Sequence, residues 1–190
     1  MTLKSKVIPE WEVLNDLLSC DFETGKLFWR VRNIKYFQSE VRARQWNTRY
    51  SGVEAFTYSD ANGYKCGHIL GSRFLAHRVI WKMWNRITPD MDIDHINGNK
   101  SDNRIDNLRL ATFSENSWNA EKRSDNTSGH KGVSFDKRRG VWVAYINAYG
   151  KRKHLGRFYL IEDAYKAYEK ASIDIHGEFS SVVSRSMGDD

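Results

Sequence analysis

Apolar and polar positions alternate with the periods of short helices and strands through the first part of the chain. Apolar residues at helical spacing over 10–19 predict a short amphipathic helix, and the apolar run 27–31, which follows a turn, predicts a strand. The runs 53–58 and 64–70 flank an Asn-Gly pair, a strong signal for a hairpin turn. We therefore expect a small antiparallel sheet over 27–75.

The middle of the chain begins with a second predicted helix. Apolar residues of 76–84 fall on one helical face, and the helix is expected to end before Pro89. His77 in this helix and His68 before it neighbour aromatic residues, and packing or hydrogen bonding is the favoured interpretation of both. The stretch 92–119 then gives a short apolar strand, a polar turn, a second strand and a helix rich in amides.

The last third of the chain predicts a sheet followed by a helix. A polar segment at 121–132 is typical of a linker and marks the clearest boundary in the chain. Three strand-like runs separated by turns predict strands at 133–135, 141–148 and 152–159. An apolar stripe over 161–175, ended by a glycine, predicts a helix that covers one face of this sheet.

Composition narrows the class of protein. The chain has 190 residues, a net charge of +6 and a pI near 9.3, which favour an anionic partner but do not choose between nucleic acid, acidic membrane and plain solubility. No apolar run approaches the roughly 20 residues that span a bilayer, and the first ten residues lack the apolar stretch of a signal peptide. Cys20 and Cys66 stand alone, so a zinc ribbon or disulfide framework is not expected. A reducing, cytoplasmic setting fits best.

The stretch 32–51 is both basic and aromatic. One interpretation is an arm that follows DNA phosphates while its aromatic rings stack on bases. The other is a solvated loop whose aromatic rings pack on the core, and the sequence leaves both open. The residues concerned are Arg32, Lys35, Arg42, Arg44 and Arg49 among Tyr36, Phe37, Trp46 and Tyr50.

An acid and a histidine stand next to each other at Asp94 and His95. Phosphodiester hydrolysis needs an activated water and positive charge for the developing phosphorane. Asp94 offers a hard oxygen ligand for Mg²⁺, and His95 is neutral enough near pH 7 to act as a general base. Neighbours on a strand point to opposite faces, so both reach one target only through a kink or bulge. Asn107 is expected to hold the loop, and Asn116 and Asn119 to share one helix face.

Residues 94–112 read Asp-His-Ile-Asn-Gly-Asn-Lys-Ser-Asp-Asn-Arg-Ile-Asp-Asn-Leu-Arg-Leu-Ala-Thr, and Glu-Asn-Ser-Trp-Asn follows at 115–119. This ordered set resembles the HNH endonucleases, in the branch found as phage homing endonucleases. The resemblance extends upstream to cover roughly residues 10–120. It implies a ββα-metal fold with strands at 92–96 and near 108–111 and a helix from about Ser114.

The resemblance also implies a role for each matching residue. Asp94 would be a metal ligand, His95 the general base and Asn107 the asparagine that braces the loop. Asn116 would be the second metal ligand, where many relatives have histidine, so this is an H-N-N variant that favours Mg²⁺ or Mn²⁺ over Zn²⁺. Asn119 is a weaker candidate for a metal or phosphate contact. Lys100 and Arg109 either touch the scissile strand or are ordinary surface charges.

Charge separates the last third of the chain into two parts. Residues 122–157 carry ten basic side chains against two acidic ones, whereas acids outnumber bases from Tyr159 onward. A basic sheet backed by an acidic helix is a polarised unit with its sheet facing phosphates, and a sheet of this kind can enter a major groove.

Residues 128–135, 142–146 and 153–158, with the alanine-rich helix after them, resemble an APETALA-two/ethylene-response-factor DNA-binding domain. Such domains occur in plant regulators and appended to phage HNH enzymes. The resemblance implies that Ser134, Tyr145, Asn147, Arg152 and His154 face base edges. It implies that Lys131, Arg138, Arg139 and Trp142 meet backbone or sugar. The plant domains carry more arginine and tryptophan at base-facing places, so their preferred sequence does not transfer.

These observations predict an α+β chain. A small antiparallel sheet with helices leads into a ββα-metal HNH motif, and a three-stranded antiparallel sheet packed on one helix follows. The predicted HNH nuclease domain is 1–121, with its ββα-metal core at about 91–120. A linker at 122–130, a DNA-binding sheet and helix at 131–180 and a tail at 181–190 complete the chain.

The predicted function is site-specific, sequence-tolerant DNA cleavage of the homing type. One divalent metal, Mg²⁺ or Mn²⁺ rather than Zn²⁺, would assist hydrolysis to 5′-phosphate and 3′-hydroxyl ends. The expected partner is double-stranded DNA, with no membrane and no obligate protein partner; a monomer is expected and a dimer stays open. The alternatives are a non-catalytic DNA-binding regulator that uses the C-terminal module alone, and a structure-specific or RNA-directed nuclease. The target sequence and nicking versus double-strand cleavage stay open.

Overall fold

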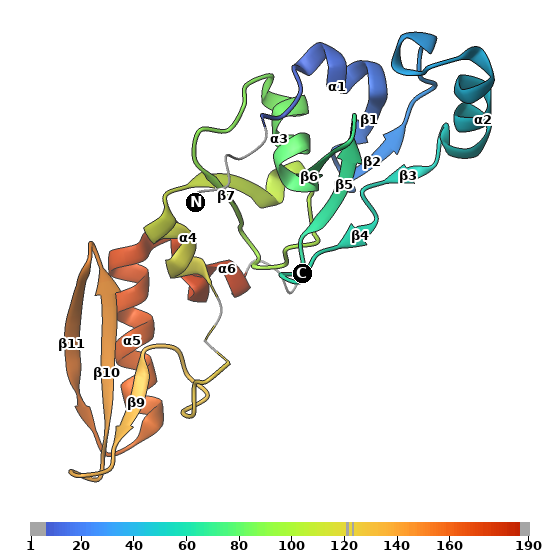
Figure 1. Ribbon diagram of the computed structural model, residues 1–190. Helices are drawn as coiled ribbons and strands as arrows, with labels where there is room; N and C mark the ends of the chain where they lie inside the picture. The colour runs from blue at the N-terminus through green and yellow to red at the C-terminus, as the bar shows by residue number, and fades with distance from the viewer. Residues whose placement is uncertain (1–6, 121, 123, 187–190) are drawn as a thin grey trace. The chain divides into compact units, whose positions relative to one another are not determined.

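The computed structural model describes residues 7–120, 122 and 124–186 and contains two compact units (Figure 1). The first unit comprises the chain up to His95 together with Asn99–Leu110, and the second comprises Ile96–Gly98 and the chain from Ala111 onward. The division therefore falls before the helix expected from about Ser114, whereas the sequence predicts a domain boundary after residue 121.

The first unit joins short helices to small antiparallel sheets. The strand orders are β1-β2-β3 and β4-β5-β6, and β7 and β8 form a two-stranded sheet. The elements in chain order are α1 (Trp11–Leu17), β1 (Leu18–Asp21), β2 (Lys26–Trp29), the 3₁₀ helix η1 (Ile34–Tyr36), α2 (Glu40–Tyr50), β3 (Glu54–Ala55), β4 (Tyr58–Ser59), β5 (Lys65–Ile69), β6 (Ser72–Leu75), α3 (Ala76–Asn85), β7 (Asp92–His95), the 3₁₀ helix η2 (Ile105–Asn107) and β8 (Leu108–Ala111).

Helix α3 is the centre of the first unit. Its apolar stripe, including Val79 and Ile80, is fully buried among side chains of α1, β2 and the β5–β6 hairpin. Lys82 lies on the same helix and is 1% exposed; its ammonium donates to the Ile8 carbonyl and to the Glu10 carboxylate. These bonds satisfy a charge that burial would otherwise destabilise. The helix predicted at 76–84 is confirmed.

The sheet expected over 27–75 forms as two sheets instead of one. Phe56 has φ +60, a left-handed conformation that breaks the apolar run 53–58 into β3 and β4. The hairpin turn at Asn62-Gly63 is present, with Gly63 at φ +88. The stretch 32–51 contains α2, which the apolar pattern does not predict because only Ala43 of this helix is buried.

The second unit is a three-stranded antiparallel sheet, ordered β9-β10-β11, covered on one face by a long helix (Figure 1). Val133, Ala144 and Ile146 from the sheet pack against Ala164 and Tyr168 from that helix. The elements are α4 (Phe113–Asn119), β9 (Val133–Asp136), β10 (Val141–Ala148), β11 (Lys151–Phe158), α5 (Ile161–His176), the 3₁₀ helix η3 (Gly177–Phe179) and α6 (Ser181–Ser186).

The predicted fold class is confirmed as α+β with small antiparallel sheets and helices. One close approach in the second unit requires glycine. A Cβ on Gly132, which has φ +73, would overlap the Tyr168 ring, so the chain entering β9 lies directly on α5. None of the helices in the described ranges is long and apolar enough to cross a bilayer.

Candidate active site

Strand β7 places Asp94 and His95 in the interior of the first unit, 5% and 3% exposed. Both Nε and an Nη of Arg109, on the neighbouring strand β8, donate to Asp94 Oδ2 at 2.9 and 2.8 Å. Two bonds from one guanidinium hold the carboxylate in a fixed orientation. From the sequence, Arg109 could be either a DNA contact or an ordinary surface charge. In the structure it is largely buried and ion-paired with Asp94.

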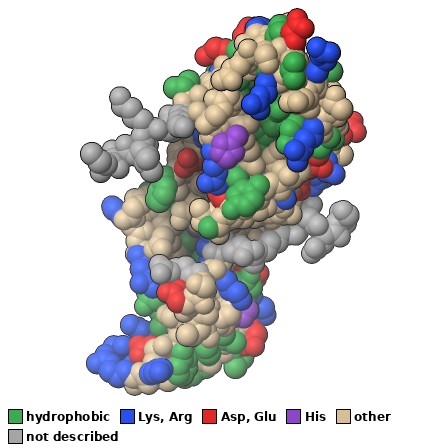
Figure 2. Space-filling model, turned by 45° about the vertical axis from the view of Figure 1, so that its right-hand side comes forward, with side chains coloured by type: hydrophobic (Ala, Val, Ile, Leu, Met, Phe, Trp, Pro, Cys, Tyr) green, Lys and Arg blue, Asp and Glu red, His purple; other side chains and the backbone are tan. Residues whose placement is uncertain are grey.

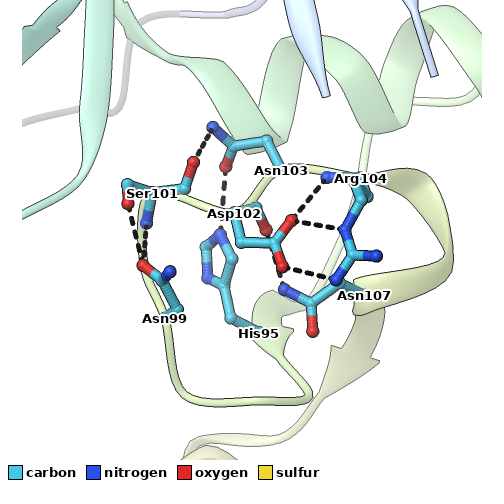
Figure 3. Close-up of polar contacts among 7 residues, drawn as sticks. All are labelled: His95, Asn99, Ser101, Asp102, Asn103, Arg104 and Asn107. Atoms are coloured by element: carbon cyan, nitrogen blue, oxygen red, sulfur yellow. Dashed lines mark hydrogen bonds and ion pairs between the residues drawn. The ribbon is translucent and has the colours of Figure 1, made fainter. Parts of the chain in front are cut away.

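His95 is bonded to Asn103, a residue that the sequence analysis did not select (Figure 3). The His95 Nε2 and Asn103 Oδ1 atoms lie 3.0 Å apart, and Asn103 Nδ2 faces the Ser101 carbonyl at 3.4 Å. Because that carbonyl can only accept, the amide oxygen is the atom that faces the imidazole, and Nε2 must donate to it. This tautomer leaves Nδ1 as the basic nitrogen of His95.

The His95 ring forms a cluster with two other rings. His77 lies edge-on at 5.1 Å between ring centroids, and Tyr64 lies 5.9 Å from His95 and 5.1 Å from His77. Burial lowers the pKa of His95, and the bond to Asn103 opposes that shift. A lowered pKa keeps the imidazole neutral, and so able to accept a proton, at pH values below its ordinary range.

His77 packs in the same cluster, as expected, and gives a prediction about stability. Burial, and then the neighbouring His95, lower the pKa of His77 to about 3, and its Nδ1 has no hydrogen-bond partner. Below pH 6.5 the unfolded chain binds a proton that the fold does not, so stability falls with acid by about 1.4 kcal/mol per pH unit. We expect a loss of about 2 kcal/mol between pH 7 and pH 5, measured by urea unfolding.

The control for this prediction is His77→Phe, which keeps a ring beside His95 but cannot be protonated. We expect the variant to lose most of that pH dependence. His95 should account for the smaller dependence that is left, because its pKa shifts in the same direction. An equally steep loss of stability in His77→Phe would show that His77 is not the group responsible.

The loop after β7 is held by asparagine and aspartate side chains (Figure 3). Asn107, which is 6% exposed, donates from Nδ2 to the Asp102 carbonyl at 2.7 Å. Asp102 in turn accepts from Arg104 Nε and Nη at 2.9 and 2.8 Å. The turn between β1 and β2 supports the same loop, because Gly25 approaches the Asn103 backbone so closely that a Cβ would overlap it. The loop that carries Asn103, the partner of His95, is therefore held at several points.

Lys100 and His68 lie outside this cluster. The ammonium of Lys100 donates to the Asn62 carbonyl and lies 5.0 Å from the Tyr64 ring centroid, so it fastens the β4–β5 turn. His68 is exposed on β5.

Helix α4 carries the two remaining candidate ligands and belongs to the second unit. It begins at a capping box, in which Thr112 and Glu115 bond reciprocally to each other's backbone. Asn116 is half-buried, whereas Asn119 is buried and donates from Nδ2 to the Ile96 carbonyl at 3.3 Å. Asn119 thus ties α4 to the turn that directly follows His95.

The C-terminal end of α4 is fixed within the second unit. The Lys131 ammonium donates to three carbonyls at this end, the shortest two being those of Ala120 and Trp118 at 2.5 and 2.7 Å. The Trp118 ring stacks on His176 of α5 with centroids 4.5 Å apart and planes 10° apart. A cation on exposed helix carbonyls is favourable for the helix dipole. Lys131, predicted as a DNA-backbone contact, is therefore already engaged inside the unit.

The residues predicted to face base edges lie on the sheet of the second unit. Since Ala144 and Ile146 point into the core, the alternating Tyr145 and Asn147 point to the face away from α5. Across the ladder, Tyr145 is opposite His154 and Asn147 is opposite Arg152. The Arg152 guanidinium lies 3.8 Å from the Tyr145 ring centroid. Ser134 is opposite Val143 in the ladder and so lies on the same face as Tyr145. These five candidates share one sheet face.

The other residues predicted to meet the DNA backbone or sugar lie in two different environments. Arg138 and Arg139 are exposed in the β9–β10 turn, and Lys and Arg side chains gather at this tip of the unit (Figure 2). Arg139 also pairs with Asp136 at 2.9 Å. Trp142 instead packs at the margin of the core, with its ring 4.9 Å from Phe135.

Comparison with known proteins decides the family. Residues 74–118 match the family model described as HNH endonuclease. Protein 3.8 of Escherichia phage T7 is 38% identical over 105 residues, which cover 55% of this chain and 86% of that protein. The chain belongs to the HNH endonuclease family. A protein named uncharacterized HNH endonuclease L560, from Acanthamoeba polyphaga mimivirus, is 30% identical over 126 residues, 65% of this chain and 64% of that protein. No solved structure matches.

The family match covers the residues just described. It begins in β6, includes Asp94, His95 and the loop that holds them, and ends within α4. The order β7, β8, α4 along the chain is the ββα order of an HNH motif. The HNH endonuclease domain supports a nuclease and implies DNA as the substrate.

Sequence reasoning missed Asn103 as the partner of His95. The available signal was a repeat of the Asp-Asn pair, at 102–103 and again at 106–107, of which only the second asparagine was selected. The two asparagines are both buried and bond to different parts of the same loop.

Proposed function

We propose that the protein is a metal-dependent, site-specific DNA endonuclease of the homing type, yielding 5′-phosphate and 3′-hydroxyl ends. The observation that carries this proposal is the buried His95, held by Asn103 in the tautomer with a basic Nδ1 and next in sequence to the ion-paired Asp94. A strand that presents a base beside a carboxylate within the HNH match has the two groups that hydrolysis requires.

His95 acts on the attacking water in this proposal. Its Nδ1 takes the proton of the water, and the Nε2–H bond to Asn103 supports the imidazolium that forms. Burial keeps the base neutral before the reaction, and Asn107 holds the loop on which Asn103 lies. The oxygen that leaves phosphorus is the 3′ oxygen.

Asp94 and Asn116 are the proposed ligands of one divalent metal ion. Both offer hard oxygen donors, which suit Mg²⁺ or Mn²⁺ better than Zn²⁺. Among the described residues, no three His, Cys, Asp or Glu side chains cluster as a metal site. The two bonds from the Arg109 guanidinium hold the buried Asp94 carboxylate in one orientation, which supports its role as a fixed metal ligand. When bound, the metal ion supplies positive charge for the phosphorane and the leaving oxygen.

The sheet of the second unit is proposed to read the DNA sequence. Support comes from the single face shared by Ser134, Tyr145, Asn147, Arg152 and His154, and from exposed Arg138 and Arg139 at its end. Side chains on one face can reach base edges while arginines at the turn bind phosphates. A nuclease motif joined to such a face supports site-specific cleavage rather than general degradation.

Arg152→Ala is expected to weaken specific binding by roughly 1–3 kcal/mol and to relax sequence preference at one position of the site. The reason is the loss of a base-edge donor that stacks on Tyr145. Binding of the protein to a panel of duplexes with single-base changes measures this effect. Lys166→Ala, an exposed change on α5, is the matched control. An unchanged preference in Arg152→Ala would place Arg152 outside the reading surface.

One experiment tests the function as a whole. The protein is incubated with phage and host DNA and Mg²⁺, and the ends of each product are mapped on both strands, with a chelator as control. Discrete sites with 5′-phosphate ends are expected. Binding without any cleavage would favour the regulator alternative, and 3′-phosphate ends would contradict the proposed chemistry.

A further inference from the structure

Helix α2 lies at the edge of the first unit and buries almost nothing (Figure 1). Of its eleven residues only Ala43 is buried, although the helix has a proper start, with the Ser39 hydroxyl accepting from the Arg42 backbone. A surface helix of a globular protein usually carries an apolar stripe that packs on the core. On α2 the inward side is limited to buried Ala43 and the partly buried Trp46, Asn47 and Tyr50, so most of the helix surface faces solvent.

The aromatic residues of 29–50 fasten α2 to the unit. The Arg32 guanidinium contacts both the Trp29 and the Trp46 rings, 4.4 and 3.8 Å from their centroids. The backbone of Arg32 also exchanges two hydrogen bonds with the Asn47 side chain, at 2.9 and 3.0 Å. Phe37 and Tyr50 lie beside the Trp46 ring. These rings are packed on one another and hold the helix in place.

The arginines of α2 point the other way. Arg42, Arg44 and Arg49 are exposed, and within the described ranges no carboxylate pairs with them. Arg42 and Arg49 are seven residues apart, so they share a helix face and lie about 10 Å apart along the axis. Residues 30–51 hold six Lys or Arg and one acid, a net charge of +5 in a chain whose net charge is +6.

We propose that α2 is a second DNA-binding element, which anchors the first unit on the phosphate backbone independently of base sequence. The inference rests on the proposed function for its substrate, double-stranded DNA. Arginine suits this task because its guanidinium binds phosphate oxygens in a fixed fork geometry. A membrane surface is a poorer partner, since a helix that lies on lipid needs a broad apolar face opposite its basic one. The rigid aromatic attachment of α2 keeps the arginines in place for binding.

The test compares two double variants of the full chain that each remove two exposed charges. Arg42→Gln with Arg49→Gln changes α2, and Lys166→Gln with Lys170→Gln changes the outer face of α5 as the matched control. Binding to a labelled duplex of about 40 base pairs is followed by fluorescence anisotropy in a chelator, where no cleavage takes place. The salt concentration is varied between about 50 and 200 mM.

Two lost phosphate contacts should reduce the slope of log Kobs against log salt by about 1.8. The factor by which affinity falls between 50 and 200 mM salt should then be about twelve times smaller for the α2 variant than for the wild type. The control variant should keep the wild-type slope. The same slope in the α2 variant would overturn the proposal. Arginine-dependent binding to single-stranded RNA or to anionic vesicles, without an effect on duplex DNA, would overturn it as well.

Cleavage is measured separately with Mg²⁺, so the two ideas fail in different ways. If the wild-type protein binds duplex DNA through α2 but never cleaves it, the proposed role of α2 is supported and the nuclease function is contradicted. A protein that cleaves as proposed, with no change in the α2 variant, contradicts only the anchor.

Discussion

Replacing His95 with alanine is expected to lower the rate of DNA cleavage by two to four orders of magnitude and to leave DNA binding nearly unchanged. The imidazole is buried and its tautomer is fixed by Asn103, so its Nδ1 is the proton acceptor in the proposed reaction. Single-turnover cleavage of a labelled duplex gives the rate, and anisotropy in a chelator gives the affinity.

Two further variants test whether this loss belongs to a base. His68→Ala removes an exposed histidine of the same unit and should cleave at the wild-type rate. Asn103→Ala keeps the imidazole but removes the acceptor for Nε2–H, and a ten- to hundredfold loss is expected, as for other residues that orient a reactive histidine. Wild-type cleavage by His95→Ala would remove His95 from the mechanism.

Much of the fold was predictable because most elements carry a periodic apolar pattern. The helices α1, α3 and α5 and the strands β9 and β10 each bury apolar residues on one side, whereas β11 contributes only the partly buried Leu155 and Phe158. Helix α2 buries only Ala43 fully, and it is held by the contacts of Arg32 with the Trp29 and Trp46 rings and by the Asn47 bonds, which form only after the chain has folded back. Phe56 likewise has a left-handed conformation that an apolar run does not announce.

In the candidate site, too, some residues were predictable from the sequence and others were not. Asp94 and His95 were found because they are adjacent in the chain and a motif follows them. Their partners were not predictable, since Arg109 meets Asp94 only through the pairing of β7 with β8, and Asn103 meets His95 only through the conformation of a loop. The sequence likewise gave no sign that Lys131 would bind the end of α4.

Asp94→Asn is expected to lower Mg²⁺-dependent cleavage on the order of a thousandfold, because the change removes the charged ligand that holds the metal ion. The variant also leaves Arg109 buried without its carboxylate, a loss that costs stability by itself. Arg109→Gln separates the two effects, since it breaks the same ion pair but keeps the ligand. If Asp94 binds the metal, Mg²⁺ should raise the melting temperature of Arg109→Gln, by neutralising the buried carboxylate, and should leave that of Asp94→Asn unchanged. An equal response of both variants to Mg²⁺ would show that the ion binds elsewhere.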